Sequence, residues 1–156
     1  MKTKKLESLL ISILFPLAVG LVSALFANGM RSTYMQLVKP ALSPPAVVFP
    51  IVWTILYVLM GISAYLIANS ESDKKAEAMR LYFVQLGFNF FWSIFFFSFG
   101  WYLFSFVWLV ALIILIVKMI LSFKEINPLA AYLQIPYLLW CLFAAYLNFM
   151  IYYLNR

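Results

Sequence analysis

The stretch LFSFVWLVALIILIVKMILSF, residues 103–123, contains a single charged residue, Lys118. A helix that crosses the hydrocarbon core of a bilayer needs about 20 mostly apolar residues. Backbone N–H and C=O groups have no water to bind there, so only helices and closed barrels span a membrane. A spanning strand would be about ten residues long and would alternate apolar with polar residues, which this stretch does not do. Residues 103–123 therefore predict a transmembrane helix.

Four more apolar runs of similar length accompany this stretch. They cover residues 6–27, 46–68, 81–99 and 129–154. The whole chain is 67% hydrophobic and 10% charged, whereas a soluble domain is about half apolar and about a quarter charged. The first run is longer than the apolar core of a cleaved signal peptide, about 7–15 residues, so we expect it to be the first span. The sequence predicts an all-α integral membrane protein, a single domain over residues 1–156 built as a bundle of five transmembrane helices.

The linkers between these runs differ in kind. Residues 69–80 are polar and predict a surface loop, and residues 100–102 predict a tight turn between two antiparallel helices. Residues 124–128 end one helix and place a proline at the start of the next, where proline is favoured. The longest linker, residues 28–45, combines three prolines with apolar residues. Because a linker this long in a compact protein is usually functional or disordered, we expect an ordered lid over a pocket.

Basic residues are concentrated on one side of the predicted bundle. With five spans, the N-terminal tail and the linkers 69–80 and 124–128 share a side, which carries most of the Lys and Arg residues. The positive-inside rule then places the N-terminus in the cytoplasm. The net charge of +6 comes from residues that flank apolar runs and form no basic stripe, so we expect contact with lipid headgroups and no nucleic-acid partner.

Several kinds of catalytic site are excluded by the residue inventory. The chain has no histidine and one cysteine, Cys141, which excludes an internal disulfide and a histidine-based triad. All five acidic residues lie in tails or predicted loops. A metal centre or a carboxylate pair within the membrane therefore lacks ligands, and we expect neither a metal nor a cofactor.

Residues spaced three or four apart share one face of a helix, and this spacing places polar and aromatic side chains on one face of three predicted spans. In residues 46–68 this face carries Phe49, Trp53, Tyr57, Met60 and Ala64. In residues 81–99 it carries Gln85, Asn89, Trp92, Ser93 and Phe96. In residues 129–154 it carries Trp140, Ala144 and Asn148, and Pro136 predicts a kink in mid-span.

Two interpretations of these faces remain open. Aromatic side chains can pack on neighbouring helices, and buried polar side chains in membranes commonly form interhelical hydrogen bonds. The same residues can instead line an apolar ligand pocket in which a few polar groups fix the orientation of the ligand. Small residues also recur at four-residue spacing in the first span, from Gly20 to Ala24 and from Ser23 to Ala27. They favour close approach of helices, within one chain or between two.

Three sequence motifs carry a resemblance to a known family. They are KPALSPPAVVFPIVWTILYVLMG at residues 39–61, QLGFNFFWS at residues 85–93 and PYLLWCLFAAYLN at residues 136–148. Their order and content resemble the tryptophan-rich sensory protein and translocator protein family, also called the peripheral benzodiazepine receptor family, and its bacterial members in particular. The length and the five apolar runs extend the resemblance over the whole chain.

The resemblance implies a five-helix bundle, commonly a homodimer, in the bacterial cell membrane. It implies a receptor or sensor that binds porphyrins such as protoporphyrin IX, and isoquinoline carboxamide or benzodiazepine-type drugs, in a pocket beneath the first long loop. By position, the pocket residues of the family fall on Tyr34, Trp53, Asn89, Trp92, Ser93, Trp140 and Ala144. Light-dependent porphyrin breakdown in bacterial members makes Trp53 and Trp140 candidate photochemical residues, and transport of tetrapyrroles is the alternative function.

The chemistry of these side chains agrees with such a ligand. Indole faces stack on flat conjugated rings, and Asn89 and Ser93 can hydrogen-bond a carbonyl or a propionate. Arg31 or Lys39, in the long linker, can pair with a porphyrin carboxylate. Animal members of the family are associated with sterols, and Leu147, Tyr152 and Arg156 match a weak pattern proposed for cholesterol contact. Most occurrences of that pattern are ordinary helix ends, so sterol as a partner stays open.

Overall fold

The computed structural model describes residues 2–27 and 31–156. Its helical elements, in chain order, are α1 (Lys2–Ala27), α2 (Arg31–Gln36), α3 (Val48–Ala68), α4 (Lys75–Ser93), the π-helical turn η2 (Ile94–Ser98), α5 (Tyr102–Ile126), α6 (Pro128–Tyr132) and α7 (Ile135–Leu154). Over these described residues, five helical segments are long and apolar enough to cross a membrane. They are Thr3–Ala27, Val48–Ala68, Lys75–Ser98, Tyr102–Ile126 and Pro128–Leu154. The predicted all-α, five-helix class is confirmed.

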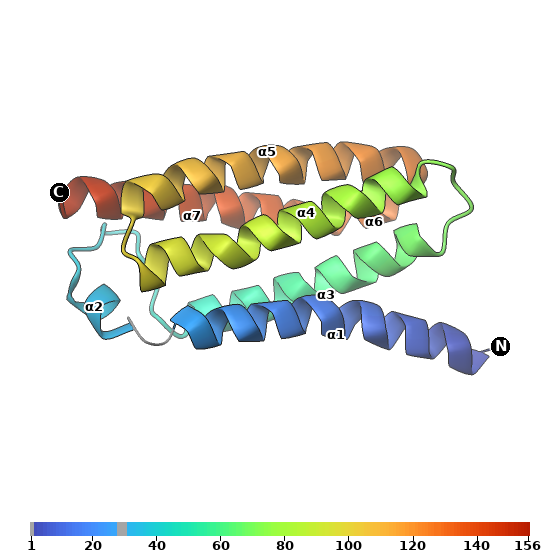
Figure 1. Cartoon of the computed structure of the whole chain (residues 1–156), viewed down its shortest axis with the longest axis horizontal. Helices are drawn as coiled ribbons and strands as arrows, with labels where there is room; N and C mark the ends of the chain where they lie inside the picture. Colours follow the sequence, from blue (N-terminus) through green and yellow to red (C-terminus); the bar gives the residue numbers. More distant parts are fainter. Residues whose placement is uncertain (1, 28–30) are drawn as a thin grey trace.

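The long helices lie side by side along one axis (Figure 1). α1, α4 and α7 run in one direction, and α3 and α5 run in the other. We call the end that holds the N-terminus of α1 and the linker 69–74 the base. The opposite end holds residues 31–45, which we call the lid, together with the C-terminus. The elements that surround the candidate site therefore meet at the lid end.

The third span begins earlier than the apolar run suggests. Residues 75–80 belong to the first turns of α4, and the polar linker is reduced to residues 69–74. Lysine, alanine, glutamate, methionine and arginine are all strong helix formers, and Glu77 lies in the first turn, where a negative charge stabilises the helix dipole. Hydropathy marks only the part of the helix that meets lipid, so it misses this polar extension.

The fifth span is divided close to the base. The side chain of Asn127 accepts hydrogen bonds from the backbone N–H groups of Leu129, at 3.0 Å, and Ala130, at 3.3 Å, and so caps α6. The chain turns at residues 133–134 and resumes as α7, in whose first turn Pro136 lies. A proline there costs no helical hydrogen bond. The interruption predicted from Pro136 therefore lies at the start of α7 instead of in mid-span.

The third and fourth spans are joined by the predicted tight turn. The last turn of the third span widens into η2, and Gly100 follows with φ of 64°. Backbone in this left-handed region favours glycine because other residues are strained there by Cβ. The turn lets α4 and α5 run antiparallel as neighbours (Figure 1).

Two glycines bring α1 against α3. A Cβ on Gly61 would lie 2.4 Å from the Cα of Ile13 and 2.5 Å from the carbonyl oxygen of Ser12. A Cβ on Gly20 would lie 2.2 Å from a ring carbon of Tyr57. The backbone of α1 thus rests directly on Gly61, and the ring of Tyr57 rests on Gly20. Close contact of this kind is how helices associate in lipid, where no hydrophobic force drives them together.

The contact at Gly61 predicts a specific loss of stability. Gly61→Ala forces two helix backbones apart, and overpacking of this kind costs about 1–3 kcal/mol. We expect the thermal unfolding midpoint of the protein in detergent to fall. The matched control is Gly87→Ala, because a Cβ at Gly87 meets no atom within 4 Å. Equal midpoints for the two variants would contradict this account of the α1–α3 contact.

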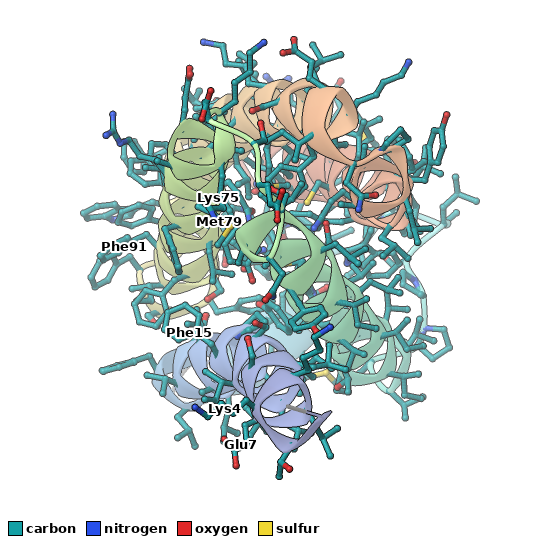
Figure 2. All side chains as sticks on the ribbon, turned by 90° about the vertical axis from the view of Figure 1, so that its right-hand side faces the viewer. Lys4, Glu7, Phe15, Lys75, Met79 and Phe91 are labelled. Carbon is teal, nitrogen blue, oxygen red and sulfur yellow. The ribbon has the colours of Figure 1, made fainter. Side chains whose placement is uncertain are left out.

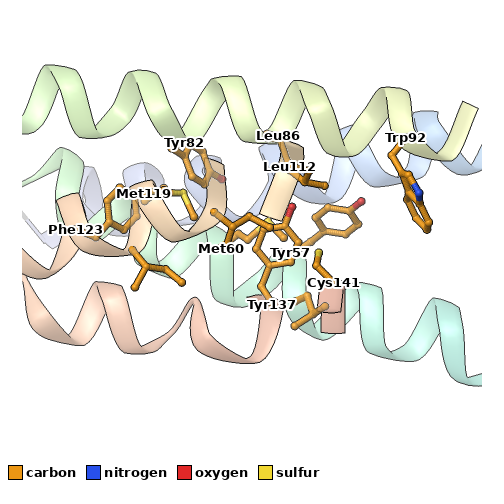
Figure 3. Close-up of a cluster of buried hydrophobic side chains, with 14 of the residues drawn as sticks. Tyr57, Met60, Tyr82, Leu86, Trp92, Leu112, Met119, Phe123, Tyr137 and Cys141 are labelled. Atoms are coloured by element: carbon orange, nitrogen blue, oxygen red, sulfur yellow. The ribbon is translucent and has the colours of Figure 1, made fainter. Parts of the chain in front are cut away.

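A group of fully buried side chains fills the bundle between its middle and its base. Figure 3 shows Met60, Tyr82, Leu112, Met119 and Phe123 packed among the helices, and each is at most 2% exposed. Outward-facing apolar side chains are suited to lipid, and Figure 2, which looks onto the base, shows one of them projecting from α4, at Phe91. The lid end, in contrast, contains open space.

Candidate functional site

A cavity of about 570 Å³ lies at the lid end between α1, α2, α3 and α4. This volume falls within the range of about 300–1,000 Å³ that is typical of small-molecule sites. Its walls are mostly apolar and aromatic, with a few hydroxyl and amide groups. The lining residues are Leu17, Gly20, Leu21, Ser23, Ala24, Ala27, Tyr34, Met35, Ala46, Phe49, Pro50, Trp53, Thr54, Tyr57, Asn89, Trp92, Ser93 and Phe97.

The aromatic wall of the cavity is built around Trp53 of α3. Its ring stacks on Tyr57 with centroids 5.6 Å apart and lies 6.2 Å from Trp92 of α4, tilted by 38°. Trp92 in turn stacks on Phe96, one helical turn further along the chain. The spacing of these residues in the sequence places them on facing helix surfaces, and the structure joins them into one continuous wall.

The opposite wall comes from small residues of α1. Gly20, Ser23, Ala24 and Ala27 all line the cavity. The sequence suggested only that these residues permit close helix approach, and nothing in their side-chain chemistry distinguishes a packing contact from a cavity wall. Their small volume leaves room opposite the tryptophans, which is the space that a flat ligand needs.

The lid contributes Tyr34, which lies in α2 and contacts Phe96 and Phe97 edge-on, at centroid distances of 5.9 and 5.3 Å. Burial raises the pKa of the Tyr34 phenol, and nearby Tyr102 raises it further, so the hydroxyl stays neutral. The ammonium group of Lys39 lies 4.9 Å from the centre of the Tyr34 ring, a cation–π contact with a residue that lines the cavity. The side chain of Arg31 lies outside the described residues.

The lid is also fastened to the C-terminus. The side chain of Asn155 accepts a hydrogen bond from the N–H of Val38 and donates one to its carbonyl oxygen, both at 2.9 Å. A side-chain amide thus pairs with a backbone peptide group 117 positions away in the chain. Sequence reasoning missed this contact, because an asparagine at a helix end is most simply explained as a local cap.

Serine and asparagine side chains that line the cavity are hydrogen-bonded to protein. The hydroxyls of Ser23 and Ser93 are hydrogen-bonded to each other across α1 and α4, and Ser93 donates to the carbonyl oxygen of Phe90 at 3.1 Å. Asn89 is 2% exposed, accepts from the hydroxyl of Tyr57 at 2.9 Å and donates to that of Tyr137 at 2.9 Å. Interhelical hydrogen bonds, one of the two explanations left open by the sequence, therefore occupy the amide of Asn89 in this structure.

Two of the ligand-binding residues expected from the resemblance, Trp140 and Ala144, do not line this cavity. Trp140 lines a second depression of about 400 Å³ between α3 and α7, and its ring contacts Phe49 edge-on at 5.9 Å. Ala144 is 7% exposed and packs in the core. Asn148, on the same face, accepts from the indole N–H of Trp92 at 3.1 Å. The structure thus gathers Tyr34, Trp53, Asn89, Trp92 and Ser93 around the cavity, while α7 supports the wall from behind.

The site offers no evident place for a metal ion. Across residues 2–27 and 31–156, no group of three or more His, Cys, Asp or Glu side chains could hold one. The arrangement is instead suited to a mostly apolar, flat molecule with a polar edge, since stacking surfaces line the walls and a cation lies near the mouth.

Comparison with known proteins supports the resemblance found in the sequence. The model of the TspO/MBR family matches residues 12–154. The chain is 38% identical to the tryptophan-rich protein TspO of Archaeoglobus fulgidus over 94% of this chain and 96% of that protein. It is 37% identical to the protein of the same name from Chlorobaculum tepidum, over 97% and 98%. It is 33% identical to a tryptophan-rich sensory protein of Cereibacter sphaeroides, over 74% and 72%.

Proposed function

This chain belongs to the TspO/MBR family, and we propose that it is a membrane receptor or sensor that binds porphyrins such as protoporphyrin IX. We extend the proposal to flat drug-like ligands of the isoquinoline carboxamide and benzodiazepine type. The observation that carries it is the cavity of about 570 Å³ with the Trp53–Trp92 wall on one side and the small residues of α1 on the other. A planar conjugated ring fits between two such walls and can stack on the indoles.

The lid supplies the charge that a porphyrin requires. Protoporphyrin carries two propionate groups at one edge of an apolar macrocycle, and Lys39 lies at the cavity mouth beside Tyr34. With the macrocycle inside, the propionates face the mouth, where a lysine forms charge-assisted hydrogen bonds with a carboxylate. The buried end of the cavity contains hydroxyl and amide groups that are already bonded to protein, so it favours the apolar edge of the ring.

An absorbance titration tests the proposal directly. Purified protein in detergent is titrated with protoporphyrin IX in strict darkness, with a buffer-and-detergent blank. We expect a saturable change in the main porphyrin band. A linear response that matches the blank would show partitioning into micelles only and would contradict the proposal.

A second candidate function is light-driven breakdown of the bound porphyrin. Trp53 and Trp92 line the cavity, so oxidisable indoles would contact the excited ring. Transport of tetrapyrroles across the membrane is the remaining alternative. Vectorial uptake of porphyrin into sealed vesicles would favour transport, and product formation only under illumination would favour breakdown.

We further propose that the base of the bundle faces the cytoplasm of the cell. Lys4 and Glu7 project outward from α1 at this end (Figure 2), and Lys74 of the linker 69–74 pairs with Glu125 in the last turn of α5. The hydrogen bond to Glu125 raises the pKa of Lys74, so this lysine keeps its positive charge. An excess of basic residues marks the cytoplasmic side of a membrane protein.

Cysteine labelling in intact cells tests this orientation. The native Cys141 is 0% exposed, so a membrane-impermeant maleimide should leave the unmodified protein unlabelled. We expect labelling of an Arg156→Cys variant and none of a Thr3→Cys variant until the cells are opened. The reverse pattern would place the lid in the cytoplasm.

A further inference from the structure

A chain of hydrogen bonds leads from the cavity wall into the core. The hydroxyl of Tyr57, which lines the cavity, donates to Asn89 at 2.9 Å, and Asn89 donates to the hydroxyl of Tyr137 at 2.9 Å. Tyr137 then donates to the carbonyl oxygen of Gln85 at 2.8 Å. Every donor in this chain points the same way, away from the cavity. Bonds aligned in this manner polarise and strengthen one another.

The chain ends on a donor that lacks an acceptor. Gln85 is 0% exposed, and its Nε2 group has no hydrogen-bond partner among the residues that the structure describes. The same holds for both polar atoms of the Gln134 side chain, which is also 0% exposed, and for the hydroxyl of Tyr82, which is 2% exposed. Leaving a buried polar group unpaired costs about 1–3 kcal/mol, so such a cluster calls for a missing partner.

Helix direction places these groups in one layer. α4 and α7 run in the same direction (Figure 1), and Gln85 on α4 is bonded to Tyr137 on α7. Tyr82 precedes Gln85 by three residues, and Gln134 precedes Tyr137 by three residues. Since residues three apart share a helix face, Tyr82 lies one turn closer to the base than Gln85. Gln134, the residue that caps the start of α7, lies about one turn closer to the base than Tyr137. Figure 3 shows Tyr82 and Tyr137 inside the same buried cluster.

We propose that this layer is a buried water site bounded by Tyr82, Gln85 and Gln134. A water molecule can accept from the two amide N–H groups and donate to the Gln134 carbonyl oxygen, with the Tyr82 hydroxyl as a further partner. Buried waters typically make about three such bonds. The water completes the hydrogen-bond chain that begins at Tyr57 in the cavity. A metal cation is a poorer occupant, because the three side chains are neutral and such ions require several oxygen ligands.

Water contact can be measured by NMR on ¹⁵N-labelled protein in lipid nanodiscs. We expect magnetisation transfer from water to the side-chain amide protons of Gln85 and Gln134. The matched control is Asn148, a 1% exposed amide that donates to the carbonyl oxygen of Tyr102 and accepts from Trp92 and Ser105. Asn148 should show no transfer. Two results would overturn the proposal. One is the absence of transfer from water at the amides of Gln85 and Gln134, as at Asn148. The other is equal transfer at all three residues.

A near-isosteric variant identifies the role of Gln134. Gln134→Met keeps the length of the side chain and removes both polar atoms, so the water loses two partners. We expect the water signal at Gln85 to fall severalfold, while the dark titration with protoporphyrin stays as in the wild type. An unchanged signal at Gln85 would remove Gln134 from the site. Should Gln134→Met fail to fold, Tyr82→Phe tests the same layer through the loss of one hydroxyl. Because porphyrin binding is a separate readout, failure here leaves the proposed function untouched.

Discussion

Ala24→Trp should weaken protoporphyrin binding about ten- to a hundredfold. Ala24 lies on the α1 wall of the cavity, opposite the tryptophans, and an indole at this position occupies the space that a ligand ring would fill. Forcing an extra group into filled space costs about 1–3 kcal/mol, and each 1.4 kcal/mol is a tenfold change in affinity. The dark absorbance titration measures the effect, and the thermal unfolding midpoint shows whether the variant remains folded.

The matched control places the same ring in the other depression. Leu139 lines the depression between α3 and α7 and is 61% exposed, so Leu139→Trp should fold and bind porphyrin as the wild type does. Comparison of the Ala24→Trp and Leu139→Trp variants therefore shows which of the two sites holds the porphyrin. Loss of binding in Leu139→Trp, with binding retained in Ala24→Trp, would move the ligand to the side of α3 that faces Trp140.

Trp53→Phe should separate binding from photochemistry. Phenylalanine keeps a flat apolar face, and the stacking that it alters is worth about 0.5–1.5 kcal/mol, so dark binding should fall by at most about tenfold. Phenylalanine is much harder to oxidise than indole, so light-driven loss of bound porphyrin should fall by a far larger factor. The measurement is the decay of porphyrin absorbance under illumination, at saturating ligand.

Two further tryptophans serve as controls for this effect. Trp108 donates its indole N–H to the carbonyl oxygen of Phe88 at 2.8 Å and stacks on the ring of Phe88, away from the cavity. Trp108→Phe should therefore decay at the wild-type rate. Trp140→Phe tests the assignment that came from the resemblance, since Trp140 lies outside the cavity in this structure. If porphyrin bound to Trp53→Phe decays as fast as in the wild type, the Trp53 indole takes no part in the photochemistry and only lines the cavity.

The spans and the aromatic wall were predictable because each leaves a periodic signal. A run such as residues 103–123 has one stable solution in lipid, and Trp53, Asn89 and Trp92 stand at helical spacing in their spans. A single sequence gives the face of each helix but not how the faces are rotated against one another. The resemblance, and not helical spacing, grouped Trp140 with Trp53, whereas the structure places Trp140 in the depression between α3 and α7.

The contributions of α1 and of the C-terminus were not predictable. Gly20 and Ala24 carry no chemistry of their own, and their value lies in the space that they leave beside α3 and α4. The pairing of Asn155 with Val38 joins residues that no local pattern connects. The polar start of α4 at Lys75 was missed for a different reason, since hydropathy detects the membrane and not the helix that continues beyond it.

The most direct test of the central claim is the structure of the protein with protoporphyrin IX, prepared and kept in the dark. The account predicts the macrocycle in the cavity at the lid end, in van der Waals contact with Trp53 and Trp92 on one face and with α1 on the other. It also predicts the propionates at the mouth beside Lys39. A macrocycle in the depression between α3 and α7, or on the outer surface of the bundle, would contradict it.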